Sequence, residues 1–298
     1  MRVDELELPD GVAELLQEEG IVELHPPQAK AVPYALDGKN LMLAIPTASG
    51  KSLVAYLAAA KQVLERGGKV LYIVPLRALA SEKFDDLKKF ERLGGLKVAM
   101  SAGDLDSPDP QLDNFDIIVA TSEKADSLLR HQSSWLERIS LVVADEVHLI
   151  HDPGRGPTLE VTLTKFRKLN PSLQVIALSA TIKNAREVAD WLDAELVTSE
   201  WRPTPLKEGV FIDGEIVFTD NTRRKVPVRK DVLWSLVADS IAEGGQCLVF
   251  VNTRRSTETM AAKFAKLTGE VMGEPMLEGV DDLADDQGEQ TTIGKTLK

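Results

Sequence analysis

Short apolar runs alternate with helical patterns through the first two hundred residues, and this alternation limits the folds open to the chain. Runs of Val, Ile and Leu without polar interruption are typical of strands covered on both faces, and intervening helices favour a parallel sheet. We therefore predict an α/β fold in which helices flank a parallel sheet. Helices are expected at 51–66 and 76–93, and the predicted strands are 40–45, 69–75, 96–103, 115–121, 139–146 and 173–181.

The chain changes character near residues 201–205, where the sequence WRPTP predicts a stiff, extended connector. Beyond it, a hairpin is expected over 206–218 and a helix over 231–243. The run 246–255 is expected to repeat the earlier strand-and-loop pattern and to be followed by a helix over 255–267, and 269–298 is expected to be a loop or disordered. The predicted organisation is a lead-in (1–21), a first domain (22–200), the connector (201–205) and a partial second domain (206–298).

The stretch Ile45–Ser52 lies between a predicted strand and a predicted helix, which is the context of a phosphate-binding loop. Backbone N–H groups of such a loop surround phosphates, and the following helix adds its positive end. Lys51 would reach the β- and γ-phosphates and Ser52 would ligate Mg²⁺. Ile45 replaces the first glycine of the usual pattern, so a chance Gly-Lys-Ser turn is the alternative. The candidate nucleotide-binding residues are Pro46, Thr47, Ala48, Ser49, Gly50, Lys51 and Ser52.

Two adjacent carboxylates, Asp145 and Glu146, follow the apolar run LVVA. Such a pair at the end of a buried strand is costly unless it faces a cation or solvent. In a hydrolysis site, Asp145 would help to hold Mg²⁺ and Glu146 would orient and deprotonate the attacking water. Alone, the pair could be an exposed strand end. Together with Lys51, it predicts a site that hydrolyses a nucleoside triphosphate. His148 either links this site to another domain or forms a hydrogen bond within its loop.

Five short motifs occur in the order and spacing of superfamily 2 helicases, and the set resembles the Ski-like branch. Two more motifs extend the likeness into the predicted second domain. The chain is most similar to the archaeal DNA-repair helicases related to the helicase half of polymerase theta, over roughly residues 4–267. The motifs are PTASGKS (46–52), PLRALA (75–80), TSEK (121–124), DEVH (145–148), SAT (179–181), RPTPL (202–206) and FVNTRR (250–255).

The resemblance implies a RecA-like P-loop domain followed by the start of a second RecA-like domain. It implies ATP and Mg²⁺ as cofactors, and a 3′-to-5′ helicase or translocase in replication-fork repair or recombination. The expected partner is single-stranded or forked DNA. RNA stays open, because backbone contacts do not distinguish the sugars well. A nucleotide-responsive nucleic-acid clamp, an RNA helicase of the same superfamily and a P-loop kinase are the competing hypotheses.

By the same resemblance, Gln28 would lie over the adenine, although a glutamine after two prolines is otherwise a turn residue. Arg77, Thr121 and Glu123 would line the single strand and contact its phosphates. Arg77 could instead be a solvated surface residue. Thr121 and Glu123 could be a helix N-cap and its capping-box partner, a role compatible with contacting phosphate.

Ser179 and Thr181 would couple the ATP state to the relative position of the two domains, with a plain strand-end turn as the alternative. From the second domain, the resemblance implies contacts to the strand from Asn252, Thr253 and Arg254. The basic run 223–225 is interpreted as a solvated hairpin or loop face rather than a nucleic-acid contact.

The net charge of −12 argues against a broad basic face for nucleic acid, so binding would use a local groove and few arginines. No apolar run approaches 18 residues and the N-terminus is acidic, so we expect neither a membrane span nor a secretion signal. The single cysteine, Cys247, is expected to be buried in its apolar run. A monomeric protein in the cytoplasm is the resulting expectation.

Relatives complete their ATP site with arginines from a late second-domain stretch resembling Q-x-x-G-R-x-G-R, and no such pattern occurs up to Lys298. An arginine finger contributes roughly 10³–10⁵ in rate in related systems. We therefore expect this polypeptide to bind ATP–Mg²⁺, to bind single strands weakly, to hydrolyse poorly and not to unwind alone.

Overall fold

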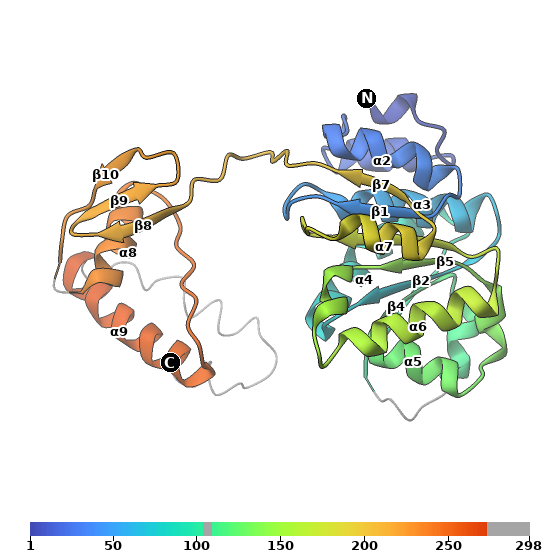
Figure 1. Ribbon diagram of the computed structural model, residues 1–298. Helices are drawn as coiled ribbons and strands as arrows, with labels where there is room; N and C mark the ends of the chain where they lie inside the picture. The colour runs from blue at the N-terminus through green and yellow to red at the C-terminus, as the bar shows by residue number, and fades with distance from the viewer. Residues whose placement is uncertain (104–108, 230, 273–298) are drawn as a thin grey trace. The chain divides into compact units, whose positions relative to one another are not determined.

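The computed structural model describes residues 1–103, 109–229 and 231–272. The chain forms two compact units, Met1–Pro205 and Leu206–Lys298, each with its own packing (Figure 1). The residue boundaries predicted for the lead-in, the connector and the two domains stay predictions.

The first unit is built on a seven-stranded sheet in which every strand pair is parallel. The predicted parallel α/β sheet is therefore confirmed, and all six predicted strands are present. The seventh, β7, pairs with β1 at the edge of the sheet and was missed. In the order β3-β4-β2-β5-β6-β1-β7, the strands are Val98–Ser101, Ile117–Thr121, Lys69–Val74, Ile139–Ala144, Gln174–Ser179, Leu41–Ala44 and Glu195–Thr198.

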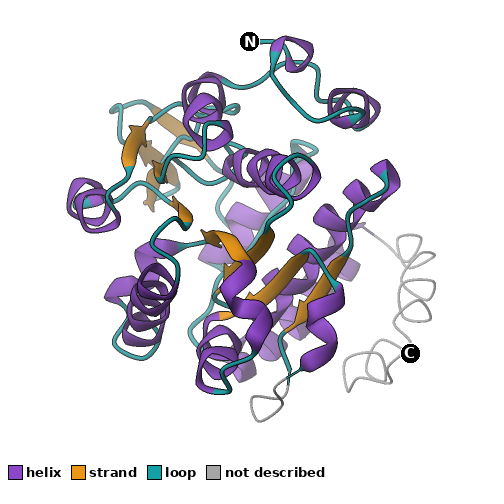
Figure 2. Cartoon of the chain, turned by 90° about the vertical axis from the view of Figure 1, so that its right-hand side faces the viewer, coloured by secondary structure: helices purple, strands orange, loops and turns teal. Residues whose placement is uncertain are grey.

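Helices cover both faces of this sheet, which explains the apolar runs (Figure 2). Successive strand side chains point to opposite faces. Leu41 and Leu43 of β1 therefore pack with α1–α4, whereas Met42 and Ala44 pack with α5–α7. The helices are α1 (Val12–Glu18), α2 (Pro26–Leu36), α3 (Lys51–Leu64), α4 (Arg77–Lys88), α5 (Ser122–Arg130), α6 (Gly156–Leu169) and α7 (Ala185–Leu192).

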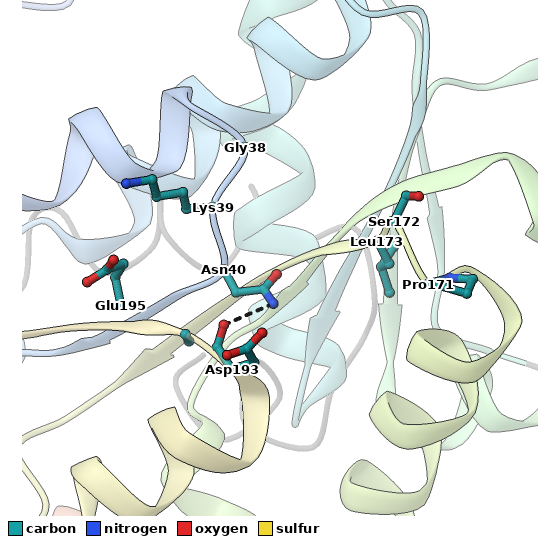
Figure 3. A pocket seen from close by; sticks show the side chains of 9 residues that line it. Gly38, Lys39, Asn40, Pro171, Ser172, Leu173, Asp193 and Glu195 are labelled. Carbon is teal, nitrogen blue, oxygen red and sulfur yellow. Dashed lines mark hydrogen bonds between the residues drawn. The ribbon is translucent and has the colours of Figure 1, made fainter.

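The predicted functional loops of the first unit all leave the carboxyl ends of strands, so the sheet places them along one edge. This is the edge where open α/β sheets bind ligands. A cavity of about 460 Å³ lies at the opposite edge, beside the amino ends of β1, β6 and β7 (Figure 3). There the Asn40 amide donates to the backbone carbonyls of Leu192 at 3.0 Å and Asp193 at 3.3 Å. This cavity contains none of the predicted site residues.

The second unit contains a three-stranded antiparallel sheet with the order β10-β9-β8 and two helices. Strands β8 and β9 confirm the hairpin expected over 206–218, and α8 confirms the helix expected over 231–243. The other helix continues to Met272, so the interpretation of 269–272 as loop was wrong. The rest of that segment lies outside the described residues. The bounds are Gly209–Ile212 (β8), Glu215–Phe218 (β9), Arg223–Lys225 (β10), Val232–Ala242 (α8) and Arg254–Met272 (α9).

The strand predicted within 246–255 does not form. Leu248 and Phe250 are 80% and 86% exposed, and no described strand pairs with this run. The expectation that Cys247 is buried is also wrong, because the thiol is exposed on the same segment. Across the part of the chain that the structure describes, no helix combines the length and apolar character needed to cross a membrane.

Candidate functional site

The loop between β1 and α3 has the geometry of a phosphate cradle. Ile45 continues the sheet, since its N–H donates to the Ser179 carbonyl at 3.2 Å. The backbone then enters the left-handed region at Ala48 (φ 64°) and Gly50 (φ 73°) before α3 starts at Lys51. The first N–H groups of a helix have no intrahelical acceptor, and they carry the positive end of its dipole. This loop therefore presents donors to an anion.

Gln28 lies beneath this loop and holds it. Its Nε2 donates to the Gly50 carbonyl at 2.8 Å, and its Oε1 accepts from the His25 N–H at 2.7 Å. The side chain is only 4% exposed. A Cβ at Gly50 would collide with the Gln28 amide nitrogen, so both the backbone angle and the available space require glycine here. The structure thus places Gln28 against the 45–52 loop, and its contact with adenine stays a prediction.

Trp201 also contacts the loop, which the sequence did not suggest because the residue was assigned to a connector. Its carbonyl accepts from the Ser49 hydroxyl at 3.1 Å. Its indole packs on the His25 ring, with 4.6 Å between the ring centroids. The chain that follows β7 is therefore fastened to the nucleotide loop by a hydrogen bond and an aromatic contact.

Lys51 and Glu146 meet across the sheet edge although they are far apart in sequence. The ammonium donates to Glu146 Oε1 at 2.9 Å, and the Lys51 residue is only 8% exposed. Glu146 has a φ of 54°, a left-handed conformation that is uncommon outside glycine and is often found at functional sites. His148 Nδ1 lies 3.2 Å from the other oxygen, Glu146 Oε2.

Asp145 is buried beside this pair, at 4% exposure. Its Oδ1 accepts from the Glu146 N–H at 2.9 Å, and its Oδ2 accepts from the Tyr72 hydroxyl at 3.1 Å. Burial raises the pKa of the Asp145 carboxyl, as does the charge of Glu146, while the cations Lys83 and Lys51 oppose that shift. Tyr72 and Lys83 were missed in the sequence because a tyrosine in an apolar strand resembles core and a lysine in a helix resembles a solvated face.

These residues fit a magnesium-bound triphosphate. Lys51 already holds an anionic oxygen, that of Glu146, which stands where a phosphate oxygen could replace it. Asp145 and Ser52 supply a carboxylate and a hydroxyl, the oxygen donors that Mg²⁺ prefers. A buried carboxylate whose charge is only partly compensated gains from a cation. The nucleotide-binding, catalytic and metal-ligand assignments remain proposals.

Arg77, the first residue of α4, is exposed and lines a hollow of about 290 Å³ with Ser101 and Asp109. Thr121 caps α5, since its hydroxyl accepts from the Lys124 N–H at 3.3 Å. The N-cap interpretation of Thr121 is thus confirmed. The capping-box role for Glu123 is wrong, because Glu123 is the second helical residue and the third is Lys124.

The remaining candidates are dispersed. Ser179 is fully buried and its hydroxyl donates to the Ala180 carbonyl at 2.7 Å, whereas Thr181 is exposed. The Ser179 hydroxyl is therefore bonded within its own segment, and the coupling role of Ser179 and Thr181 stays a prediction. Asn252, Thr253 and Arg254 lie exposed in the second unit, where their contact with a strand is untested.

The basic run 223–225 forms strand β10. Arg224 forms ion pairs with Asp239 at 2.7 Å and Glu243 at 2.6 Å, both on α8, and Arg223 lies 3.3 Å from Glu215. Two of its three cations thus have acidic partners within the second unit, in keeping with the structural interpretation rather than with a free phosphate-binding patch.

Comparison with known proteins relates this geometry to a family. The chain is 56% identical over 271 residues to the ATP-dependent DNA helicase Hel308 of Methanocella arvoryzae, covering 89% of the chain and 36% of that protein. It is 45% identical over 299 residues to Hel308 of Pyrococcus horikoshii, covering 100% of the chain and 41% of that protein. The chain thus spans about two fifths of the length of these relatives.

A solved structure and a family model agree with these relatives. The DUF1998 helicase MrfA has the same fold, with a TM-score of 0.70 and 22% identity over 91% of this chain and 42% of that one. The model of the DEAD/DEAH box helicase family matches residues 25–189, more than half of the chain and nearly all of the parallel sheet with its nucleotide loop. The chain therefore belongs to the DEAD/DEAH box helicase family.

Proposed function

We propose that the chain binds ATP with Mg²⁺ at the 45–52 loop and is the ATP-binding part of an ATP-dependent DNA helicase or translocase. One observation carries the proposal: the 2.9 Å contact between Lys51 and Glu146, with buried Asp145 beside it. This contact brings together a phosphate-binding cation, a base and a metal ligand at the carboxyl edge of the sheet. Relatives that span more than this chain are named ATP-dependent DNA helicases.

The residues suggest an order of events. A triphosphate entering the loop competes with Glu146 for the Lys51 ammonium. Once Lys51 has turned to the phosphates, the Glu146 carboxylate is released, and it can orient a water molecule and accept its proton. Ser52 and Asp145 would hold Mg²⁺, which neutralises phosphate charge when bound. The Lys51–Glu146 pair therefore keeps the base engaged until substrate arrives.

The proposed DNA site lies on the same sheet edge. Arg77 at the start of α4 and the amides at the start of α5 would contact phosphates of a single strand or fork. A chain with a net charge of −12 depends on such local donors. The 3′-to-5′ direction, a monomeric state, the contributions of Asn252, Thr253 and Arg254 and a cytoplasmic location rest on the sequence and stay predictions.

Nucleotide binding is tested by titrating the 298-residue chain with a fluorescent ATP analogue in the presence of Mg²⁺. We expect Lys51→Ala to weaken affinity about 10- to 100-fold, the effect of losing charge-assisted hydrogen bonds of roughly 1.5–3 kcal/mol. Lys61→Ala on the same helix removes a cation that pairs with Glu65 and should leave affinity unchanged. A folded wild-type chain without measurable affinity for magnesium nucleotide would refute the proposal.

Strand choice is tested by competition between single-stranded DNA and RNA of one sequence at fixed salt. We expect the chain to bind DNA more tightly than RNA. We also expect the affinity of Arg77→Ala to depend less on salt, because a protein that contacts fewer phosphates releases fewer counterions on binding. Arg92→Ala, which removes an exposed arginine paired with Glu18, is the matched control. Equal affinity for the two nucleic acids would contradict the DNA preference, and tighter binding of RNA would favour the RNA alternative.

A further inference from the structure

Tyr72 is a buried polar residue in a strand of otherwise aliphatic side chains and one lysine. It lies in β2, where its backbone is in register with Val143 of β5, two residues before Asp145. Tyr72 is 0% exposed, and its ring packs beside Tyr56 with centroids 6.0 Å apart. A phenylalanine would fill this space equally well, so packing alone does not account for the hydroxyl. A buried phenol needs a hydrogen-bond partner.

That partner is the Asp145 carboxylate, and the geometry fixes the orientation of the group. The Tyr72 hydroxyl donates to Oδ2 at 3.1 Å, while the backbone N–H of Glu146 donates to Oδ1 at 2.9 Å. The Asp145 N–H is itself held by the Ile73 carbonyl at 2.8 Å. Each carboxylate oxygen thus has one lone pair engaged by the protein and one left over.

A phenol has a single O–H donor, and the bond to Asp145 Oδ2 uses it. Rotation of the Asp145 side chain would break at least one of the two hydrogen bonds to its carboxylate. Residues that hold a metal ligand in this way commonly contribute about 10- to 100-fold to metal affinity.

We propose that Tyr72 is a positioning residue that holds Asp145 in the orientation required to bind the magnesium ion of the nucleotide complex. The inference rests on the proposed nucleotide site and adds to it a residue that touches neither nucleotide nor metal. It makes β2 as well as β5 a part of the metal site, since β2 supplies both the hydroxyl and the carbonyl that restrain Asp145.

Tyr34 provides a control tyrosine away from this acid. It lies half-buried in α2, with the Lys39 ammonium 5.3 Å from the centre of its ring. Tyr56 does not serve, because its hydroxyl, which donates to Asp86 Oδ2 at 2.9 Å, also interacts with Ser52, the other proposed magnesium ligand. Tyr34→Phe and Tyr72→Phe each remove one phenolic oxygen, but only Tyr72→Phe releases the acid proposed to face magnesium.

The experiment measures the affinity of the full chain for a fluorescent ADP analogue in EDTA, and then titrates Mg²⁺ into the complex. We expect Tyr72→Phe to raise the Mg²⁺ concentration for half-maximal effect about 10-fold. Its affinity in EDTA should stay within about twofold of wild type, and Tyr34→Phe should match wild type in both measurements. A general loss of structure would weaken the EDTA affinity as well, so this readout separates positioning from folding.

A second measurement covers the case in which Tyr72→Phe does not fold. The chain has three tyrosines, Tyr34, Tyr56 and Tyr72, so fluorotyrosine labelling gives three ¹⁹F resonances. Tyr34→Phe and Tyr56→Phe identify their own signals, and the third belongs to Tyr72. We expect that third resonance to shift when Mg²⁺ is added to the nucleotide complex, and to shift less with nucleotide in EDTA.

The outcomes are separable. If wild type binds no magnesium nucleotide, the proposed function itself fails. If wild type binds and Tyr72→Phe has an unchanged Mg²⁺ requirement, or the Tyr72 resonance does not respond to Mg²⁺, the positioning role of Tyr72 is overturned while the nucleotide site stands.

Discussion

Replacing Glu146 by glutamine should strengthen nucleotide binding, although Glu146 is a proposed catalytic residue. The Lys51 ammonium lies 2.9 Å from Glu146 Oε1, with side-chain exposures of 10% and 23%. A triphosphate must replace that contact before it can use the lysine. Weakening the contact therefore lowers the cost of binding, and removing a carboxylate also removes repulsion toward the phosphates.

The expected gain in affinity follows from the difference between the Lys51–Glu146 ion pair and the neutral hydrogen bond that a glutamine would still make with Lys51. A hydrogen bond to a charged group contributes about 1.5–3 kcal/mol and a neutral one about 0.5–1.5 kcal/mol, so the substitution releases roughly 1 kcal/mol. At 1.4 kcal/mol per factor of ten, affinity should rise about fivefold. The pair is largely shielded from solvent, so added salt should reduce this gain only weakly.

The assay is a titration of Glu146→Gln and wild type with a fluorescent ATP analogue and saturating Mg²⁺. Glu65→Gln is the control, because it removes an equal charge at the far end of α3, where Glu65 pairs with Lys61. We expect no change in the control. Weaker binding by Glu146→Gln, or an equal gain in Glu65→Gln, would show that Lys51 is not restrained by Glu146 and that the proposed exchange is wrong.

Three further outcomes are expected. Burial raises the pKa of Asp145, so the charged carboxylate opposes folding at neutral pH. Asp145→Asn should therefore raise the thermal midpoint at pH 7. This difference from wild type should vanish at low pH, where the wild-type carboxyl is protonated. Gly50→Ala should abolish nucleotide binding, whereas Gly67→Ala, also left-handed but with open space around it, should only lower the unfolding free energy by about 1 kcal/mol. In the second unit, Arg224→Ala should speed amide hydrogen exchange in α8, because it leaves two acids unpaired, and the exposed Arg223→Ala should not.

Five of the six predicted strands lie inside the sheet, where burial on both faces leaves an apolar run in the sequence. The sixth, β3, lies at an edge but keeps three of its four residues buried. The strand β7 does not have that signal. It lies at the edge of the sheet, and of its four residues only Val197 is buried, so its sequence is no more apolar than a loop. The strand β7 forms because it pairs with β1, a tertiary contact that its own sequence does not indicate.

The charged centre of the site was predicted for a comparable reason. A glycine-lysine-serine turn and an acidic pair each follow a buried strand, so a parallel sheet must place them at one edge. The sequence could not reveal that Lys51 and Glu146 touch, because their strands β1 and β5 are separated by β6. The supporting residues Tyr72, Lys83 and Trp201 have no local signal, since each occupies a position that packing or solvation alone would explain.

Tyr72 and Phe250 show why the same local pattern leads to opposite results. Both lie in short β-prone runs, KVLYIV and CLVFV, and local propensity alone would make each a strand. The first has β4 on one side and β5 on the other, so its backbone groups are paired and its side chains are covered by helices. The second has no described neighbour, and Phe250 is 86% exposed. A strand is stabilised by the strands paired with it, so local propensity alone does not decide whether a β-prone run becomes one.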